Sequence, residues 1–146
     1  MASVVRTARA SDAAAISAVS PTTSADLIER CAGLVYVAEA DGSIVGYLAL
    51  QLQAHPAVES RNPVQLWQIY VVPDFHGTGI AAGLFAAALE YARRHSHDVI
   101  WLGVSEHNAR AVAFYRKHGF GALGLHGVGT GHREHEDLVM SCQVSP

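Results

Sequence analysis

The residues from Leu66 to His95, LWQIYVVPDFHGTGIAAGLFAAALEYARRH, predict a strand, a turn and a helix. The apolar, aromatic and β-branched residues from Leu66 to Val72 are typical of a buried strand. Pro73 has no N–H to donate to a sheet, so strand pairing should stop there. From Ile80 to His95, apolar residues recur at helical spacing and alanine is frequent, which favours a helix.

Two glycines in the turn indicate an anion site at the start of this helix. Gly77 and Gly79 bracket Thr78, and glycine allows both a positive φ and the close approach of a ligand. The first N–H groups of a helix have no helical partner, and together with the helix dipole they attract phosphate. The alternative interpretation is a tight turn that binds nothing.

Other phosphate-binding motifs fit this turn poorly. A P-loop requires Lys and then Ser or Thr after its last glycine, whereas Ile80 and Ala81 follow Gly79. A dinucleotide fingerprint requires GxGxxG, but the next glycine, Gly83, comes one residue late.

The turn resembles the acetyl-CoA pyrophosphate motif of the GNAT N-acetyltransferase superfamily: Arg or Gln, two residues, Gly, one residue, then Gly or Ala. The corresponding residues here are His76-Gly77-Thr78-Gly79-Ile80-Ala81, which follow VVPDF. His76 departs from the usual Arg or Gln. Most of the motif acts through backbone N–H groups, so the resemblance still implies that acetyl-CoA binds.

A second stretch, SEHNARAVAFYRKHGF from Ser105 to Phe120, is similar to the other GNAT signature, NxxAxxFYxxxGF. It matches at Asn108, Ala111, Phe114, Tyr115, Gly119 and Phe120. The alternative is a helix N-cap for Asn108 and a core aromatic for Tyr115. Because the two signatures follow the family's order and spacing, the resemblance covers nearly the whole chain and is weakest after Gly121.

The remaining elements predict a layered α/β (α+β) fold with a mixed, mostly antiparallel central sheet flanked by helices, as in GNAT proteins. Further strands are predicted over residues 4–9, 34–39, 43–53, 99–104, 120–125 and 137–144, and further helices over 11–19, 24–31 and 108–118. Asp41-Gly42 predicts a hairpin turn. Without an internal repeat or a long linker, residues 1–146 are expected to form a single N-acetyltransferase domain.

The amino-acid composition limits the classes of protein to which the chain can belong. Half of the 146 residues are hydrophobic and 16% are charged, so a globular chain that buries about 70% of its unfolded surface is expected. The net charge of −3 gives no electrostatic case for nucleic acid or an anionic membrane. No apolar run approaches the roughly 20 residues of a membrane span. The N-terminus lacks a signal-peptide core, and Cys31 and Cys142 without a CxxC motif predict reduced thiols in a cytoplasmic protein.

Histidine is frequent, but its spacing does not predict a metal site. The nine histidines include only two close pairs, His95 with His97 and His132 with His135. A protein metal site needs about three or four ligands in fixed geometry. No metal is therefore expected, and polar loop residues in solvent are the favoured interpretation.

The GNAT resemblance implies a V-shaped opening, between the strand ending at Val72 and the strand ending at Val104, that holds acetyl-CoA. Backbone groups of Tyr70, Val71 and Val72 would bond the pantetheine arm like an added strand. The motif residues His76, Gly77, Thr78, Gly79, Ile80 and Ala81 would hold the pyrophosphate, chiefly through backbone N–H groups. Asn108 would bond the pantetheine amide from the other side, with Ala111 and Tyr115 completing the cofactor site.

The implied reaction is direct transfer of acetyl from the thioester to a primary amine of a small molecule. The amine attacks only when neutral, and a lysine-like amine has a pKa near about 10.4, so a base must take a proton. A backbone N–H at the end of the central strand would stabilise the oxyanion. Tyr115 matches the family's general acid, which protonates the departing thiolate.

The base is not identified by the resemblance. Some GNAT branches carry Glu or His where this chain has Gln65 and Trp67, and the branch that acetylates ribosomal-protein N-termini has Glu where this chain has Gly103. Glu106, next to His107, is the candidate for a base acting through water; the alternative is a solvated loop end. Further candidates are His55, Glu59 and His135.

Two other functions stay open: a protein or peptide N-acetyltransferase, and a non-catalytic acyl-CoA sensor. Gly103 weighs against the bacterial N-terminal type of the first, and the intact Tyr115 and Asn108 weigh against the second. The acceptor amine would lie against loops around residues 20–33, 54–64 and 126–136, whose sequences do not specify it. A homodimer also stays open.

Overall fold

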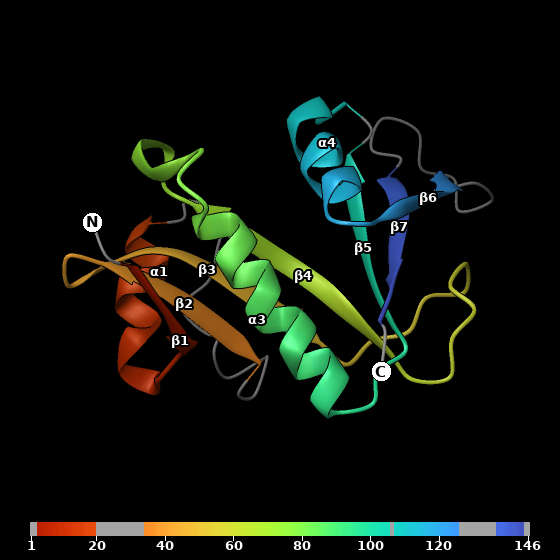
Figure 1. Ribbon diagram of the computed structural model, residues 1–146, viewed down its shortest axis with the longest axis horizontal. Helices are drawn as coiled ribbons and strands as arrows, with labels where there is room; N and C mark the ends of the chain where they lie inside the picture. Colours follow the sequence, from red (N-terminus) through yellow and green to blue (C-terminus); the bar gives the residue numbers. More distant parts are fainter. Residues whose placement is uncertain (1–2, 20–33, 106, 126–136, 145–146) are drawn as a thin grey trace. The chain divides into compact units, whose positions relative to one another are not determined.

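The computed structural model describes residues 3–19, 34–105, 107–125 and 137–144 (Figure 1). The chain divides into two compact units. Unit 1 comprises Met1–Gln51 and Leu66–Tyr91, and unit 2 comprises Leu52–Gln65 and Ala92–Pro146.

The strands form one seven-stranded sheet in the order β1-β2-β3-β4-β5-β7-β6. They are β1 (Ser3–Thr7), β2 (Val35–Ala40), β3 (Ser43–Gln51), β4 (Pro63–Val71), β5 (Val99–Ser105), β6 (Gly121–Leu125) and β7 (Asp137–Gln143). β4 and β5 are parallel, whereas β1–β2, β2–β3, β5–β7 and β6–β7 are antiparallel. The predicted mixed, mostly antiparallel sheet is therefore confirmed.

Unit 1 begins with the meander β1-β2-β3. Asp41 and Gly42 join β2 to β3 with φ values of 54° and 79°. Two successive positive φ values are typical of a type I′ turn, whose twist matches that of the strands it joins. The hairpin predicted from the Asp-Gly pair is thus confirmed.

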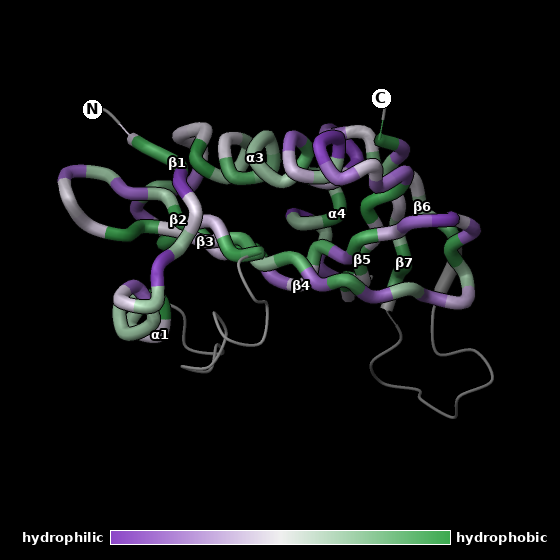
Figure 2. Tube along the Cα trace, turned by 90° about the horizontal axis from the view of Figure 1, so that it is seen from below, coloured by the Kyte–Doolittle hydropathy of each residue, from purple (hydrophilic) through white to green (hydrophobic). Residues whose placement is uncertain are grey.

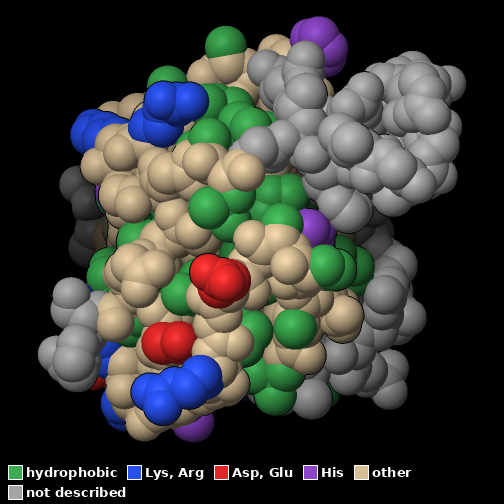
Figure 3. All heavy atoms as spheres, turned by 90° about the vertical axis from the view of Figure 1, so that its right-hand side faces the viewer, with side chains coloured by type: hydrophobic (Ala, Val, Ile, Leu, Met, Phe, Trp, Pro, Cys, Tyr) green, Lys and Arg blue, Asp and Glu red, His purple; other side chains and the backbone are tan. Residues whose placement is uncertain are grey.

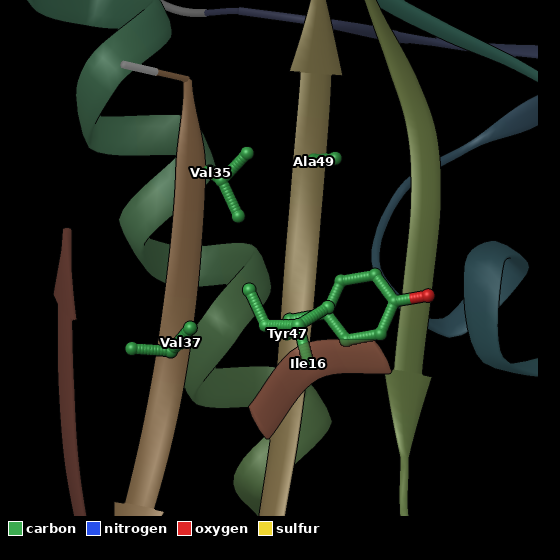
Figure 4. Packing of buried hydrophobic residues seen from close by; sticks show 5 residues of the cluster. All are labelled: Ile16, Val35, Val37, Tyr47 and Ala49. Atoms are coloured by element: carbon green, nitrogen blue, oxygen red, sulfur yellow. The ribbon is translucent and has the colours of Figure 1, made fainter. Parts of the chain in front are cut away.

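Helices cover both faces of these strands. The helices α1 (Ala13–Val19) and α3 (Ile80–Arg94) lie on opposite sides of β2 and β3 (Figure 2). On the α1 side, buried side chains of the helix and the two strands form a core cluster that comprises Ile16, Val35, Val37, Tyr47 and Ala49 (Figure 4). On the α3 side, Gly46 gives the sheet close contact with Leu84 and Val71.

Unit 2 is built around β5, whose first four residues are all buried. The start of β4 pairs with it in parallel, with Pro63 opposite Val99 and Gln65 opposite Trp101. The core of this unit comprises Val58, Val99, Trp101 and Val139. The helix α4 (Ala109–Lys117) follows β5, with Asn108 as N-cap and His118 as C-cap.

Several strands and helices begin or end at other residues than predicted. β4 starts at Pro63, not Leu66, because Val64 is fully buried and proline is tolerated as the first residue of a strand. The predicted 11–19 helix is a 3-10 turn, η1 (Ala10–Asp12), followed by α1. Asp12 ends η1, and its carboxylate accepts from the Arg9 N–H at 2.7 Å and pairs with Arg6 at 2.8 Å. The predicted helix over 24–31 lies outside the described residues.

Candidate functional site

The turn between β4 and α3 has the backbone geometry that its glycines predict. Gly77 and Gly79 have φ values of 78° and 90°, in the region that favours glycine. A Cβ built on either glycine would meet no atom within 4 Å, so the backbone here faces open space. The positive φ, not crowding, is therefore what requires glycine at both positions.

Hydrogen bonds within the turn define its shape. The short 3-10 turn η2 (Pro73–Phe75) brings the Phe75 N–H to the Val72 carbonyl at 2.9 Å and the His76 N–H to the Pro73 carbonyl at 3.1 Å. The Thr78 hydroxyl donates to the Phe75 carbonyl at 2.5 Å. Thr78 thus stabilises the turn from within.

The N-terminus of α3 lies directly after this turn. The Gly83 N–H donates to the Gly79 carbonyl at 3.0 Å, which makes Gly79 the residue that precedes the first helical turn. The N–H groups of Ile80 and Ala81 come before this first donor and have no helical acceptor. α3 runs for 15 residues, so its dipole adds a positive potential at these groups. The site suits an anion such as pyrophosphate.

The end of β4 presents its backbone in two directions. The Val72 N–H donates to Val45 of β3 at 2.9 Å, so this group faces β3. Backbone groups of successive strand residues alternate in direction, so those of Val71 face away from β3. The Val71 carbonyl accepts a hydrogen bond from the His76 ring, with Nε2 at 2.8 Å. This bond links the predicted pantetheine strand to the pyrophosphate turn.

A polar contact that the sequence did not predict joins side chains of β3 and β4. The Tyr47 hydroxyl donates to Oε1 of Gln68 at 2.9 Å, and the rings of Tyr47 and Tyr70 lie 6.3 Å apart. Tyr47 is 1% exposed, so the contact fixes the Gln68 amide from within the core. The apolar pattern of β3 could have predicted a buried Tyr47, but only the register of two strands identifies its partner.

In unit 2, the second signature forms the start of α4 and its buried face. Oδ1 of Asn108 accepts from the Ala111 N–H at 3.2 Å, so the N-cap interpretation of Asn108 is correct. This bond uses the amide oxygen of Asn108. The NH₂ group of the same side chain is a hydrogen-bond donor that this bond does not use. Asn108 itself is exposed.

Tyr115 is 8% exposed and packs its ring against Phe114 and Phe120, each with ring centroids 5.6 Å away. The core interpretation of this residue is therefore also correct. Burial raises the pKa of the Tyr115 phenol above its ordinary value of 10.0. The hydroxyl thus stays protonated through the whole neutral range.

The structure describes some of the candidate bases and not others. Glu106 and His135 lie outside the described residues. The His55 ring lies 4.9 Å from the Trp101 ring, and its Nδ1 accepts from the Ala57 N–H at 2.9 Å. Nδ1 is therefore the acceptor of the neutral ring, whose proton is on Nε2.

The positions that carry a base in other GNAT branches have other roles here. Gln65 is half-buried in β4 opposite Trp101, and Trp67 packs against the core cluster around Tyr47. Gly103 pairs with Val139 in the sheet. Within the described part of the chain, no group of three or more His, Cys, Asp or Glu side chains is placed to hold a metal ion.

The predicted residues fall in both units. Unit 1 brings together residues 70–72 and 76–81, and unit 2 brings together Asn108, Ala111 and Tyr115 on one helix. On the face shown in Figure 3, acidic and basic side chains both occur among hydrophobic atoms, and the described atoms in view form no single basic stripe. Among the described helices, none combines the length and apolar character needed for a bilayer crossing.

Comparison with known proteins identifies the family. The sequence model of the Acetyltransferase (GNAT) family matches residues 6–120. An uncharacterized N-acetyltransferase of Mycobacterium tuberculosis is 37% identical over 106 residues, which cover 73% of this chain and 64% of that protein. The streptothricin acetyltransferase of Streptomyces lavendulae is 34% identical over 86 residues, 59% of this chain and 43% of that protein.

Solved structures share the fold. Ard1 from Thermoplasma volcanium superimposes with a TM-score of 0.83 at 20% identity, with all of both chains covered. The NatC complex bound to Gag peptide and CoA gives a TM-score of 0.80 at 19% identity, with 99% of this chain and 100% of that chain covered. The chain therefore belongs to the acetyltransferase (GNAT) family, a family of acyltransferase enzymes. It spans 42% of the length of a Methanocaldococcus jannaschii relative and 64% of the mycobacterial one.

Proposed function

We propose that this protein is an N-acetyltransferase that moves acetyl from acetyl-CoA to a primary amine of a small molecule. The observation that carries the proposal is the turn at the start of α3, where Gly77 and Gly79 both have positive φ and face open space. In a chain of the GNAT family, this turn is the predicted pyrophosphate site.

The pyrophosphate would accept hydrogen bonds from the backbone N–H groups of Gly77, Gly79, Ile80 and Ala81. The positive end of α3 adds electrostatic attraction for the same charge. No cationic side chain is required for this, because the donors are backbone groups with fixed positions. The absence of an Arg at His76 is therefore compatible with binding.

The pantetheine arm would bond to the β4 segment from Tyr70 to Val72. The Val72 N–H is already bonded to Val45 and the Val71 carbonyl already accepts from His76, so the Val71 N–H, which faces away from β3, is the favoured partner. The NH₂ group of Asn108 is proposed separately to donate to a pantetheine carbonyl while its oxygen continues to cap α4.

In the proposed reaction, a neutral amine attacks the thioester carbonyl and the C–S bond breaks. Tyr115 would give its proton to the departing CoA sulfur, and its burial keeps the phenol protonated for this step. A backbone N–H would stabilise the oxyanion. Glu106 stays a predicted base, acting through water on the amine proton.

A small molecule is favoured as acceptor over a protein or peptide. The streptothricin acetyltransferase relative is named for a small-molecule substrate and is 34% identical over the matched residues. Gly103 stands where the bacterial N-terminal branch has its Glu, which weighs against a ribosomal-protein acceptor.

We further propose a single catalytic domain in the cytoplasm. Both β4 and α3 contribute residues to each unit, so neither unit is a continuous piece of chain. Cys142 carries a free thiol, as expected in a reducing compartment. The homodimer stays a prediction, which light scattering on the purified protein would test.

A two-part experiment tests the function. Calorimetry measures acetyl-CoA binding, and a screen of small amines, amino compounds and N-terminal peptides measures release of free CoA. Turnover with small amines supports the proposal, and turnover confined to peptides would reassign the acceptor. Tight acetyl-CoA binding without turnover of any amine would favour an acyl-CoA sensor instead.

A further inference from the structure

We infer that His76 is a positioning residue for the pyrophosphate turn, and that it acts by donating a hydrogen bond from Nε2 to the Val71 carbonyl. This inference rests on the proposed function, because its consequence is tighter CoA binding. It assigns to His76 a role that depends on the reach of an N–H donor and not on positive charge.

The geometry sets the direction of this bond. Nε2 of His76 lies 2.8 Å from the Val71 carbonyl oxygen, five residues earlier in the chain. A carbonyl oxygen can only accept, so Nε2 must carry the proton. The neutral ring therefore has its proton on Nε2, and a doubly protonated ring would donate in the same way.

The turn has few other means of holding its shape. Residues 76–79 are all exposed, and Cβ atoms on Gly77 and Gly79 would meet no atom within 4 Å. Packing therefore contributes little here, and hydrogen bonds such as Thr78 to Phe75 define the backbone. Glycine gains more conformational freedom on loosening than other residues, so each such bond matters for N–H groups that must converge on one ligand.

The His76 bond joins the turn to a buried anchor. Val71 is 8% exposed and lies at the end of β4, next to Gly46 of β3. A bond from the exposed turn to this carbonyl transmits the rigidity of the sheet to Gly77 and Gly79. It also sets the distance between the predicted pantetheine strand and the pyrophosphate donors.

Two variants with amide side chains of different length distinguish the effect of the donor's distance from Cα from an effect of charge. In Gln, the amide nitrogen is four bonds from Cα, as is Nε2 in His, whereas in Asn it is three bonds away. His76→Gln can therefore restore the bond to Val71, and His76→Asn keeps the same chemical group but falls short. Neither variant carries charge, so a charge effect would lower both affinities equally.

The experiment measures CoA affinity by calorimetry for the wild type and both variants, with thermal unfolding as a control for folding. We expect His76→Gln to stay within about twofold of the wild type and His76→Asn to bind roughly 3- to 10-fold more weakly, the range of one net hydrogen bond. Both variants should unfold at nearly the wild-type temperature, because the side chain is exposed.

Nitrogen NMR of the imidazole rings gives a second measurement that needs no ligand. The His76 signal, assigned by its loss in His76→Gln, should show the proton on Nε2 near neutral pH. A proton on Nδ1 would overturn the inference, as would equal CoA affinities for the Gln and Asn variants. A wild type that binds no CoA would refute the proposed function itself, and the role of His76 with it.

Discussion

The side-chain oxygen of Asn108 accepts a hydrogen bond from the backbone N–H of Ala111 at 3.2 Å, which makes Asn108 the N-cap of α4. Asn108→Asp keeps the acceptor and adds a negative charge at a helix N-terminus, so folding stability should be unchanged or higher. It removes the NH₂ donor, so CoA affinity should fall. Asn108→Ala removes both the acceptor and the donor. It should therefore lower the CoA affinity and also reduce the folding stability by about 1 kcal/mol. Calorimetry and chemical unfolding separate the two effects, and wild-type CoA affinity in Asn108→Asp would exclude the donor role.

Gly79→Val should abolish detectable acetyl-CoA binding and leave a folded protein. The branched side chain would project into the open space where the pyrophosphate is predicted, and a φ of 90° penalises it. Gly42→Val is the matched control, because Gly42 has a φ of 79° and equally open surroundings in the β2–β3 turn. The control should lose similar stability and keep its affinity by calorimetry. Equal acetyl-CoA affinities in the two variants would show that the phosphates bind elsewhere on the protein.

Gly46→Ala should destabilise the protein by about 1–3 kcal/mol, the cost of inserting a methyl group into a packed core. Its Cβ would lie 2.9 Å from the Tyr70 carbonyl oxygen and 3.2 Å from a Val71 methyl group, so β3 and β4 must separate. Gly83→Ala, whose Cβ would have ordinary contact with Val5 at 3.5 Å, should be neutral or stabilising because alanine favours helix. Urea unfolding compares the two, and equal stabilities would mean that β4 shifts without cost.

Asp98 should make unit 2 sensitive to acid. Hydrogen bonds hold its pKa below the ordinary value, first from the Ser60 hydroxyl and then from the Arg61 and Asn62 N–H groups. A lowered folded-state pKa contributes stability above the unfolded pKa of about 3.9, and this is lost as the pH falls through the folded value. Asp98→Asn should therefore be less stable at neutral pH and less sensitive to pH below about 4.

Thermal unfolding across this pH range would check the Asp98 prediction. Ser60→Ala serves as the partner variant, since it removes the largest contribution to the lowered pKa and leaves the carboxylate in place. It should reduce the acid sensitivity only in part. An Asp98→Asn variant with the full pH slope of the wild type would exclude this carboxylate as its source.

Tyr115→Phe should lower kcat and kcat/KM by about 10²–10⁴-fold and leave acetyl-CoA affinity nearly unchanged. The ring contacts with Phe114 and Phe120 persist, and only the hydroxyl is lost. Tyr91→Phe is the matched control, because burial also raises the pKa of that phenol and Tyr91 has no predicted catalytic role. Steady-state kinetics on an accepted amine would compare the two variants.

The effect would be smaller if product release limits the wild type. Wild-type kcat in Tyr115→Phe, with chemistry shown to limit the rate, would remove Tyr115 from the mechanism. Unfolding of the variant would support a purely structural role.

Local patterns in the sequence predicted much of this protein. The Asp41-Gly42 pair predicted its turn because only residues that tolerate positive φ suit it. Asn108 predicted a helix start because its side chain bonds a backbone N–H three residues later. Gly77, Gly79 and the apolar repeat of α3 likewise act over a few residues, so the candidate anion site and the family resemblance could be found before the structure.

Contacts between groups that are distant in the sequence depend on the packing of the whole chain. Pro63 begins β4 because its neighbour Val64 is buried opposite Ile100, a pairing that depends on the whole βαβ path. His76 bonds the Val71 carbonyl, and Tyr47 bonds Gln68 across two strands, because strand direction and register bring these atoms within reach. Periodicity specifies which face of an element is buried, but a hydrogen bond depends on distances of a few tenths of an ångström, which only the packed chain sets.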